Sequence, residues 1–234
     1  MKEVKIMCSL SHPCTVRLYA WTKRPPAMVM ELAATDLRQY YQGDAKEKLG
    51  EYSIVSGLEI CLDSAKGMLY IHSAGLIHRD LKSMNIMVTK DKRGKVADYG
   101  ESREQDTSLT MTSTGTALWM APEVSKNERY DSKADSFSFG VILYEVMKRD
   151  LPYADMKNIN GIGLAVKVAL DGLRPTIEDG WHPLLQELMR GCYEEDPGEL
   201  GLVFQYVRVL FTSNEAHPPT HPPTHPHSET TDLR

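Results

Sequence analysis

Short apolar runs separated by polar breaks occupy the first part of the chain. Apolar residues recur at helical spacing over residues 2–11, which predicts a helix that ends where a proline follows. Two strand-like runs come next, at 15–20 and 27–31. The basic and proline residues at 23–26 between them are typical of a turn, so the pattern predicts a hairpin.

Longer periodic patterns farther along the chain predict helices. Residues 53–73 carry apolar side chains on one helical face, with Gly75 as a stop signal. From 135 to 147 the chain is apolar on nearly every side, a pattern typical of a helix in the middle of a core. Two further helices are predicted at 161–170 and 183–193. The expected face of the first helix consists of Ile54, Leu58, Cys61, Ala65, Met68 and Leu69.

Short strands and loops are predicted between the two longest helices. Strands at 86–88 and 95–97 are joined by a turn at 91–94. Residues 101–118 are rich in serine and threonine without apolar periodicity, which indicates a surface segment. The end of the chain, 212–234, repeats histidine and proline and offers nothing to bury, so we expect disorder. A metal-binding histidine tract is the alternative reading of this tail, but nothing there pre-arranges the ligands.

Composition and charge exclude several classes of protein. Of 234 residues 41% are hydrophobic, which excludes wholesale disorder. With 27 basic and 32 acidic residues the net charge is −5, so nucleic-acid binding is not the expected function. No apolar stretch approaches ~18–20 residues and the first residues lack a signal-peptide core, so we expect no membrane span and a cytoplasmic protein. The four cysteines have no zinc-like spacing and are interpreted as reduced thiols.

One segment combines the chemical groups that phosphoryl transfer requires. Asp80, Lys82 and Asn85 share a loop, and Asp98 follows a predicted strand shortly afterwards. Transfer of a γ-phosphoryl group needs metal ions across the phosphates, a base near the attacking hydroxyl and a cation for the developing charge. Asp80 can serve as the base and Lys82 as the cation. Oxygen ligands such as Asn85 and Asp98 suit Mg²⁺, which keeps its phosphates and waters.

The ordered motifs of this region resemble those of eukaryotic protein kinases. HRDLKSMN, DYG and APE, in that order, are similar to the catalytic loop, the metal loop and the end of the activation segment. Gly115-Thr116, the run WMAPE and Lys82-Ser83 most resemble the tyrosine-kinase-like group, in its Raf and mixed-lineage branch. Members of that group mostly phosphorylate serine and threonine. The resemblance therefore implies an ATP- and Mg²⁺-dependent serine/threonine kinase that acts on protein substrates in intracellular signalling.

The fold that this resemblance implies is α+β and two-lobed. Its small lobe would be incomplete and its large lobe mainly α-helical. Residues 1–33 would be the remnant of the small lobe, with a helix, two strands and the hinge, and 34–197 would be the large lobe. The resemblance fades after that point, so 198–234 is expected to be an unrelated extension that ends in the histidine- and proline-rich tail.

Further site residues are implied by the resemblance alone. Met30 resembles the gatekeeper, and the hinge from Glu31 to Ala33 would offer its backbone to adenine. Glu3 resembles the helix glutamate that pairs with the ATP-anchoring lysine. Thr116 would lie against the catalytic loop and help to shape the platform for the substrate.

Anchoring and regulatory contacts are also implied by the resemblance. Asp135, at the start of the predicted buried helix, would hold the backbone of the catalytic loop. Arg79 suggests a cationic pocket for phosphate that a regulatory kinase places on the activation segment. The implied hydrophobic spine consists of Met7, Leu18, His78 and Tyr99. Candidate phosphorylation sites, among which the sequence does not choose, are Thr107, Ser108, Thr110, Thr112, Ser113 and Thr114.

Three departures from the family pattern qualify these expectations. Nothing that resembles the glycine-rich loop or its lysine-bearing strand precedes Glu3, and Tyr99 stands where phenylalanine is usual. No arginine shortly follows Asp196-Pro197 to pair with Glu123. We therefore expect an amino-terminally truncated kinase domain with little activity on its own. The alternative is a catalytically silent kinase-like module that binds partners as a scaffold.

Overall fold

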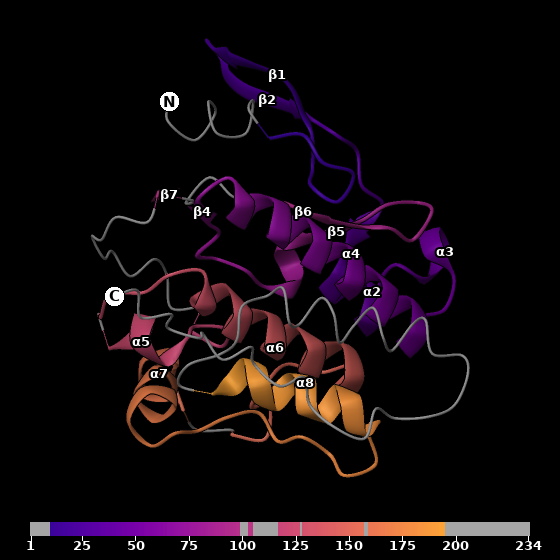
Figure 1. The fold of residues 1–234 in the computed structure, drawn as a ribbon. Coiled ribbons are helices and arrows are strands. Elements are labelled where there is room, and N and C mark those ends of the chain that lie inside the picture. Colours follow the sequence, from indigo (N-terminus) through magenta and orange to yellow (C-terminus); the bar gives the residue numbers. More distant parts are fainter. Residues whose placement is uncertain (1–9, 99–102, 105–116, 127, 157–158, 195–234) are drawn as a thin grey trace, which may run out of the picture.

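A small β-hairpin lies above a larger, mainly helical body (Figure 1). The computed structural model describes residues 10–98, 103–104, 117–126, 128–156 and 159–194. Its helices and small antiparallel sheets confirm the α+β class. Most of the helix predicted at the amino terminus, most of the serine- and threonine-rich segment and all of the tail lie outside the described residues, so those predictions stay predictions.

The hairpin consists of β1 (Leu18–Lys23) and β2 (Pro26–Met30), which pair in antiparallel fashion. The predicted hairpin is therefore confirmed, but its first strand begins three residues later than predicted. The reason is that Val16 pairs with the body instead: its N–H donates to the carbonyl of Val96 at 2.8 Å. The chain thus leaves the body before it turns into the hairpin.

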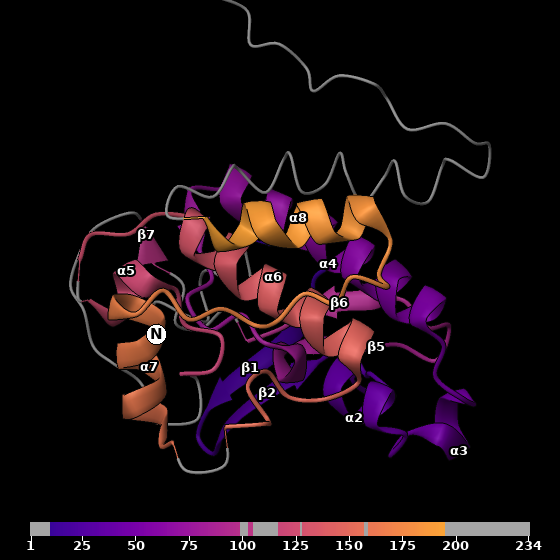
Figure 2. The ribbon, with the colours of Figure 1, turned by 90° about the horizontal axis from the view of Figure 1, so that it is seen from below.

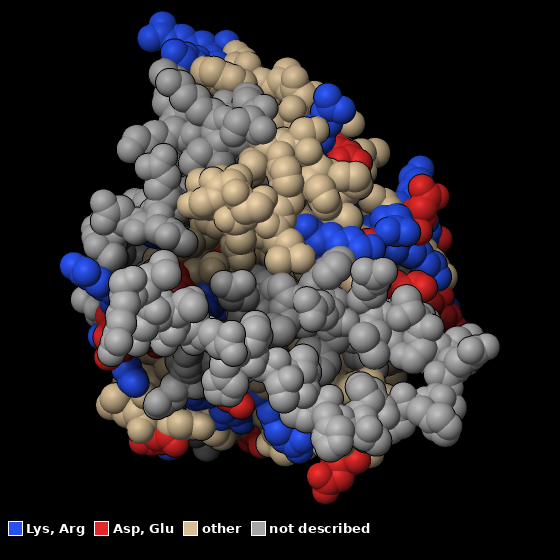
Figure 3. Space-filling view, viewed as in Figure 1, with Lys and Arg blue, Asp and Glu red and all other residues tan. Residues whose placement is uncertain are grey.

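Apolar side chains of the hairpin are exposed to solvent. Its large apolar residues are between 40% and 60% exposed, and they are Tyr19, Trp21, Met28, Val29 and Met30. In Figure 3 the surface around the hairpin is largely uncharged, with basic side chains at its outer end. A two-stranded sheet is marginal in water by itself. The core of the described structure must therefore lie in the body.

The body contains two further small sheets. Its strands are β3 (Thr35–Asp36), β4 (Leu76–Ile77), β5 (Ile86–Val88), β6 (Gly94–Val96) and β7 (Arg103–Glu104). One sheet has the order β3-β5-β6, and the other pairs β4 with β7. Ile86 lies opposite Val96, which confirms that a turn joins the two strands. The turn comes earlier than the predicted 91–94, because the N–H of Lys92 donates to the carbonyl of Thr89 at 3.0 Å. Strand β6 accordingly begins and ends one residue before its prediction.

All four helices predicted within the described residues are present, together with shorter ones that the pattern did not predict. They are α2 (Leu37–Gln42), α3 (Lys46–Leu49), α4 (Ile54–Ser73), the 3₁₀ turn η1 (Ser83–Asn85), α5 (Pro122–Ser125), α6 (Lys133–Lys148), α7 (Gly161–Leu170) and α8 (Pro183–Tyr193). The bounds of α7 and α8 agree with the prediction. The start of α4 is set by Ser53, whose Oγ accepts a hydrogen bond from the N–H of Ser56 at 3.1 Å.

Three of the six residues of the predicted α4 face are fully buried, but the buried face departs from the prediction at two positions. Ile54 is 42% exposed, whereas Asp63 is buried. Asp63 accepts two hydrogen bonds from the guanidinium of Arg93, at 2.7 and 2.6 Å, and one from the N–H of Gly94 at 3.2 Å. A charged residue thus lies on the inner face of α4 because the β5–β6 hairpin supplies its partners.

Helix α6 runs through the middle of the body, between α4 and α8 (Figures 1 and 2). Every residue from Ala134 to Val146 is buried, which confirms the prediction of a core helix. The polar exceptions in this apolar run are Asp135, Ser136, Ser138 and Glu145. Among the described residues, no helix is both long enough and apolar enough to cross a membrane.

The contact between α4 and β6 can be tested at Gly94. A Cβ at this position would lie 2.5 Å from the carbonyl oxygen of Ile60 in α4. Gly94→Ala should therefore lower the free energy of unfolding by about 1–3 kcal/mol, measured by urea unfolding. Gly180→Ala is the matched control, because no neighbouring atom lies within 4 Å of its Cβ. Equal unfolding midpoints for the two variants would contradict the close approach.

Candidate active site

The loop that carries the predicted catalytic residues, 78–85, starts after β4 and ends in η1. The backbone N–H groups of His78 and Arg79 donate to the carboxylate of Asp135 at 2.8 and 3.0 Å. His72 Nε2 lies 2.8 Å from the same carboxylate. These contacts confirm that Asp135 anchors the start of the loop.

The anchoring carboxylate stays ionised in a dry environment. Burial by itself raises the pKa of Asp135, but the hydrogen bond from His72 and the interactions with His78 outweigh this effect and hold the pKa below its ordinary value. The loop needs this anchor because Arg79 has a φ of +73°, in the left-handed region that is costly for a residue with a side chain. Helix α6 thus imposes an uncommon backbone conformation directly before Asp80.

Only one of the two carboxylate oxygens of Asp80 accepts hydrogen bonds from the described residues. Its Oδ2 accepts hydrogen bonds from Lys82 Nζ at 2.5 Å and from Asn85 Nδ2 at 3.1 Å. The same Nδ2 also donates to the backbone carbonyl of Asp80 at 2.8 Å. The buried Oδ1 has no hydrogen-bond partner within the part of the chain that the structure describes. The structure therefore brings the three predicted loop residues together around one oxygen of the Asp80 carboxylate.

Asp98 is an exposed residue two positions after the end of β6, with a φ of +57°. Its neighbour Ala97 joins it to the loop, because the Ala97 N–H donates to the carbonyl of Asn85 at 2.8 Å and the Ala97 carbonyl lies 2.9 Å from His78 Nε2. Asn85 and Asp98 thus supply oxygen donors from adjoining segments. In the described residues no group of three or more His, Cys, Asp or Glu could hold a metal by itself. A metal here would take its other ligands from phosphate and water.

The predicted adenine-contacting residues lie where the hairpin joins the body. Met30 ends β2 and is 43% exposed. The N–H of Glu31 donates to the carbonyl of Arg17 at 2.8 Å, and its carboxylate forms an ion pair with Lys95 at 2.9 Å. Ala33 follows and is half-buried. These contacts tie this connection to β6, which leads to Asp98.

Several predicted residues fall outside the described part of the chain. They are Glu3, Met7, Tyr99, Thr116 and the six candidate phosphorylation sites Thr107, Ser108, Thr110, Thr112, Ser113 and Thr114. Of the implied spine, the structure describes His78, which is fully buried, and Leu18, which is partly buried against the core.

Glu145 is a buried residue beside the loop that the sequence interpretation did not single out. Its Oε1 accepts hydrogen bonds from Tyr41 Oη and Ser83 Oγ, both at 2.8 Å, and its Oε2 accepts one from Trp119 Nε1 at 2.7 Å. Burial raises the pKa of Glu145 to about 7, although the three donors and the charge of Arg38 act against this rise. The available signal was an acidic residue inside an otherwise apolar run.

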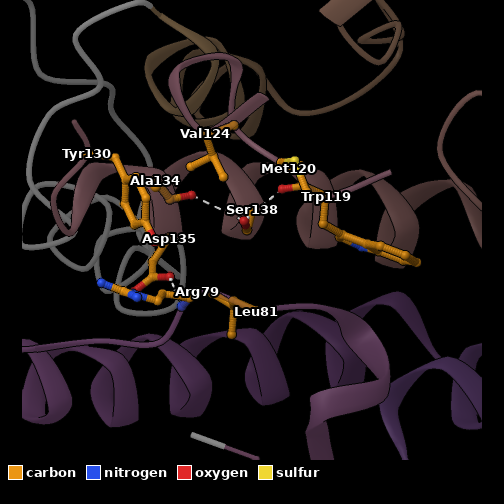
Figure 4. Close-up of a pocket in the computed structure, with 10 residues that line it drawn as sticks. Arg79, Leu81, Trp119, Met120, Val124, Tyr130, Ala134, Asp135 and Ser138 are labelled. Atoms are coloured by element: carbon orange, nitrogen blue, oxygen red, sulfur yellow. Dashed lines mark hydrogen bonds between the residues drawn. The ribbon is translucent and has the colours of Figure 1, made fainter. Parts of the chain in front are cut away.

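A pocket beside the loop contains Arg79 (Figure 4). The guanidinium of Arg79 lies 5.2 Å from the centre of the Tyr130 ring, and its buried Nε has no hydrogen-bond partner within the described residues. Trp119 and Val124 line the same pocket from the segment around α5. In Figure 4, Ser138 lies between Trp119 and Ala134, with its Oγ donating to both carbonyls at 2.7 and 3.1 Å.

Comparison with known proteins gives consistent matches. A sequence profile of the family described as protein tyrosine and serine/threonine kinase matches residues 1–204. Similar curated proteins include serine/threonine-protein kinase STY17 of Arabidopsis thaliana, 38% identical over 197 residues, and serine/threonine/tyrosine-protein kinase HT1 of the same plant, 36% identical over 201 residues. Dual specificity protein kinase shkD of Dictyostelium discoideum is 33% identical over 218 residues.

These matches cover most of the chain but only part of each relative. The match to STY17 covers 84% of this chain and 34% of STY17. The match to HT1 covers 84% of this chain and 50% of HT1, and that to shkD covers 91% of this chain and 28% of shkD. The chain thus matches half the length of each of these relatives or less. The division at 33 and 197 stays a prediction.

The raised pKa of Glu145 predicts how stability depends on pH. Between its ordinary value of 4.5 and about 7, the folded protein binds a proton that the unfolded chain has released. The free energy of unfolding of the wild type, relative to Glu145→Gln, should therefore fall by about 3 kcal/mol as the pH rises through this interval, and then level off. Urea unfolding at pH 5, 6, 7 and 8 measures the difference.

The control for this measurement is Glu47→Gln, at an exposed position in α3. It should follow the pH dependence of the wild type. A difference between wild type and Glu145→Gln that stays constant from pH 5 to pH 8 would contradict the assigned pKa.

Proposed function

This chain belongs to the protein tyrosine and serine/threonine kinase family, and from that premise we propose that it transfers the γ-phosphoryl group of ATP to serine or threonine hydroxyls of proteins. The observation that carries the proposal is the Asp80 carboxylate, which keeps one buried oxygen open while Lys82 and Asn85 hold the other. The names of STY17 and HT1 both include serine and threonine, which supports these acceptors, and that of HT1 also includes tyrosine.

Asp80 is the proposed general base. A substrate hydroxyl within hydrogen-bond reach of Oδ1 would give its proton to this carboxylate oxygen while the hydroxyl oxygen forms a bond to the γ-phosphorus. The bond between the γ-phosphorus and the oxygen that bridges it to the β-phosphorus breaks, and ADP leaves with that pair of electrons. Lys82, 2.5 Å from Oδ2, brings a positive charge to the side of Asp80 where negative charge gathers on the transferred group. Because Lys82 and Asn85 fix the carboxylate, little reorganisation accompanies the proton transfer.

Asn85 and Asp98 are the proposed ligands of Mg²⁺ that accompanies ATP. Their oxygen donors fit this ion, and the exposed position of Asp98 leaves room for phosphates. The ion neutralises charge on the phosphates when it is bound. The connection between Ala97 and Asn85 holds these two side chains in adjoining segments.

Adenine is proposed to bind along Met30, Glu31 and Ala33. The N–H of Glu31 is already paired with Arg17, so other backbone groups of this connection would face the base. Glu3 and Thr116 are proposed to complete the nucleotide and substrate sites. A cytoplasmic location is supported by the free, buried thiols, which suit a reducing compartment and belong to Cys14, Cys61 and Cys192.

The pocket around Arg79 is proposed to take a phosphate on the activation segment, added by a regulatory kinase. The buried Nε of Arg79 has no hydrogen-bond partner among the described residues, so a donor remains for a phosphate oxygen. Arg79 directly precedes Asp80. A phosphate bound there would therefore act on the backbone that positions the base.

Asp80→Asn should reduce phosphotransfer at least ~100-fold, because the amide cannot accept the proton of the hydroxyl. The measurement is transfer of labelled phosphate to a serine- and threonine-containing protein. Residues 1–234 are assayed first. The assay should also use a form extended by any in-frame upstream sequence.

Asp91→Asn is the control, because Asp91 is an exposed acidic residue in the turn between β5 and β6. It should retain the activity of the parent protein. Strong turnover by Asp80→Asn would overturn the assignment of the base. Nucleotide-independent partner binding without any phosphotransfer in the extended form would favour the scaffold alternative.

Arg79→Ala should remove the increase in activity that phosphorylation of the activation segment produces. Losing one to three charge-assisted hydrogen bonds to phosphate should lower activity of the phosphorylated protein about tenfold. Phosphotransfer is measured before and after treatment with an activating kinase, with the exposed Arg129→Ala as control. Equal activation of both variants would contradict the proposed pocket.

A further inference from the structure

The buried helix α6 carries polar side chains along one face. Ser138 and Glu145 follow Asp135 by three and ten residues, which at about 100° per residue places all three within about a quarter of the helix circumference. They are 1% (Asp135), 8% (Ser138) and 0% (Glu145) exposed. Each side chain is paired with a segment outside α6. This face of the helix therefore determines where other segments lie.

Glu145 joins three of these segments. Ser83, at the end of the candidate catalytic loop, and Tyr41, in α2, both donate to Oε1, while Trp119, shortly before α5, donates to Oε2. We call this arrangement the Glu145 clamp. Ser138 holds the backbone carbonyl of the same Trp119 at 2.7 Å. Trp119 is thus attached to α6 through both its backbone and its side chain.

The donors of the Glu145 clamp depend on its carboxylate because they are buried with it. A fully buried carboxylate strengthens the hydrogen bonds that it accepts, because no water competes for its oxygens. The indole N–H of Trp119 can only donate, so losing the carboxylate would leave that donor buried and unpaired. The loop is consequently fixed at both ends, by Asp135 at its start and by Glu145 at Ser83.

We propose that Glu145 is a positioning residue for phosphoryl transfer, which fixes the end of the loop that carries Lys82 and Asn85 and couples this end to Trp119. The inference rests on the proposed function. Ser83 lies directly after Lys82 and two residues before Asn85, so a shift at Ser83 moves both side chains that hold the Asp80 carboxylate. A misplacement of about 1 Å can lower a rate about 100-fold.

Deletions of single hydroxyl oxygens separate positioning from general stability. Ser83→Ala removes the contact of the loop with Glu145. Tyr52→Phe is the matched control, because Tyr52 Oη donates at 2.8 Å to the carbonyl of Val146, next to Glu145 but outside the clamp. Both changes remove one hydrogen bond to α6, so both should lower the unfolding midpoint.

Hydrogen exchange on the full chain shows which segment is released. In Ser83→Ala, the amides of Asn85 and Ile86, which donate to carbonyls inside the loop, should exchange at least ~10-fold faster. The two amides held by Asp135 should keep their rates. Tyr52→Phe should produce no such local difference. In the extended, active form, Ser83→Ala should lower kcat about tenfold with KM for ATP within about twofold of the parent value.

The indole N–H resonance of Trp119 provides a spectroscopic signature for the coupling. The chain has three tryptophans, so Trp119→Phe assigns this proton resonance by its loss. The chemical shift of this proton should change in Ser83→Ala, although Ser83 and Trp119 are connected only through the carboxylate of Glu145. Glu145→Gln offers a carbonyl oxygen to the indole and an amide group to the two hydroxyls. The amides of the loop should therefore exchange within about threefold of their wild-type rates in this variant. In Glu145→Leu, the protection of these amides against exchange should be lost.

The inference is overturned if Ser83→Ala and Tyr52→Phe raise the amide exchange rates by the same factor throughout the chain. It is also overturned if the chemical shift of the Trp119 indole N–H is the same in Ser83→Ala as in the wild type. It is also overturned if Glu145→Gln is as damaging as Glu145→Leu. Should Glu145→Leu fail to fold, Ser83→Ala and Glu145→Gln decide the matter. Absence of phosphotransfer in the wild-type extended form would overturn the proposed function, while hydrogen exchange would still report whether Glu145 positions the loop.

Discussion

The carboxylate of Asp135 is the contact on which the rest of the candidate site depends. Helix α6 is buried from Ala134 to Val146, so its polar groups must find partners inside the protein or cost several kcal/mol each. Asp135 finds them in the backbone N–H groups of His78 and Arg79. Because these donors belong to a loop, satisfying one buried carboxylate also fixes the position of that loop. The site therefore has the rigidity of a core helix although its reacting groups lie in irregular structure.

The same physical rule explains why polar residues are found inside the body at several places. Asp63 in α4 is buried because Arg93 and Gly94 supply donors, and this pairing brings the β5–β6 hairpin onto the helix. Asp98 lies shortly after β6, so this contact also contributes to where the proposed metal ligand lies. In contrast, the β1–β2 hairpin exposes much of its apolar surface and is tied to β6 through Glu31 and Lys95. The apolar residues of this hairpin are thus less buried than those of the elements around the loop.

Local pattern predicted the helices well and the strands less well. The bounds of α7 and α8 and the burial of α6 follow from apolar periodicity, which neighbouring residues define by themselves. The start of β1 was misplaced because the contact of Val16 with Val96, 80 positions away, competes with the hairpin. The exposed Ile54 shows the same limit, since which face of α4 is buried depends on elements that pack there from two sides.

By itself, the sequence determined the fold class, the family and the chemical groups of the loop. The order of Asp80, Lys82 and Asn85 is a local property, and the later motifs occur in the order that the family requires. Only the tertiary structure decided that Asp80 keeps one oxygen open and that Ser83 and Trp119 meet at Glu145. Tyr41, the other donor to that carboxylate, is 104 residues away from it in sequence. Contacts at such separations are set by how helices pack around α6, and a pattern of neighbouring residues carries no information about that packing.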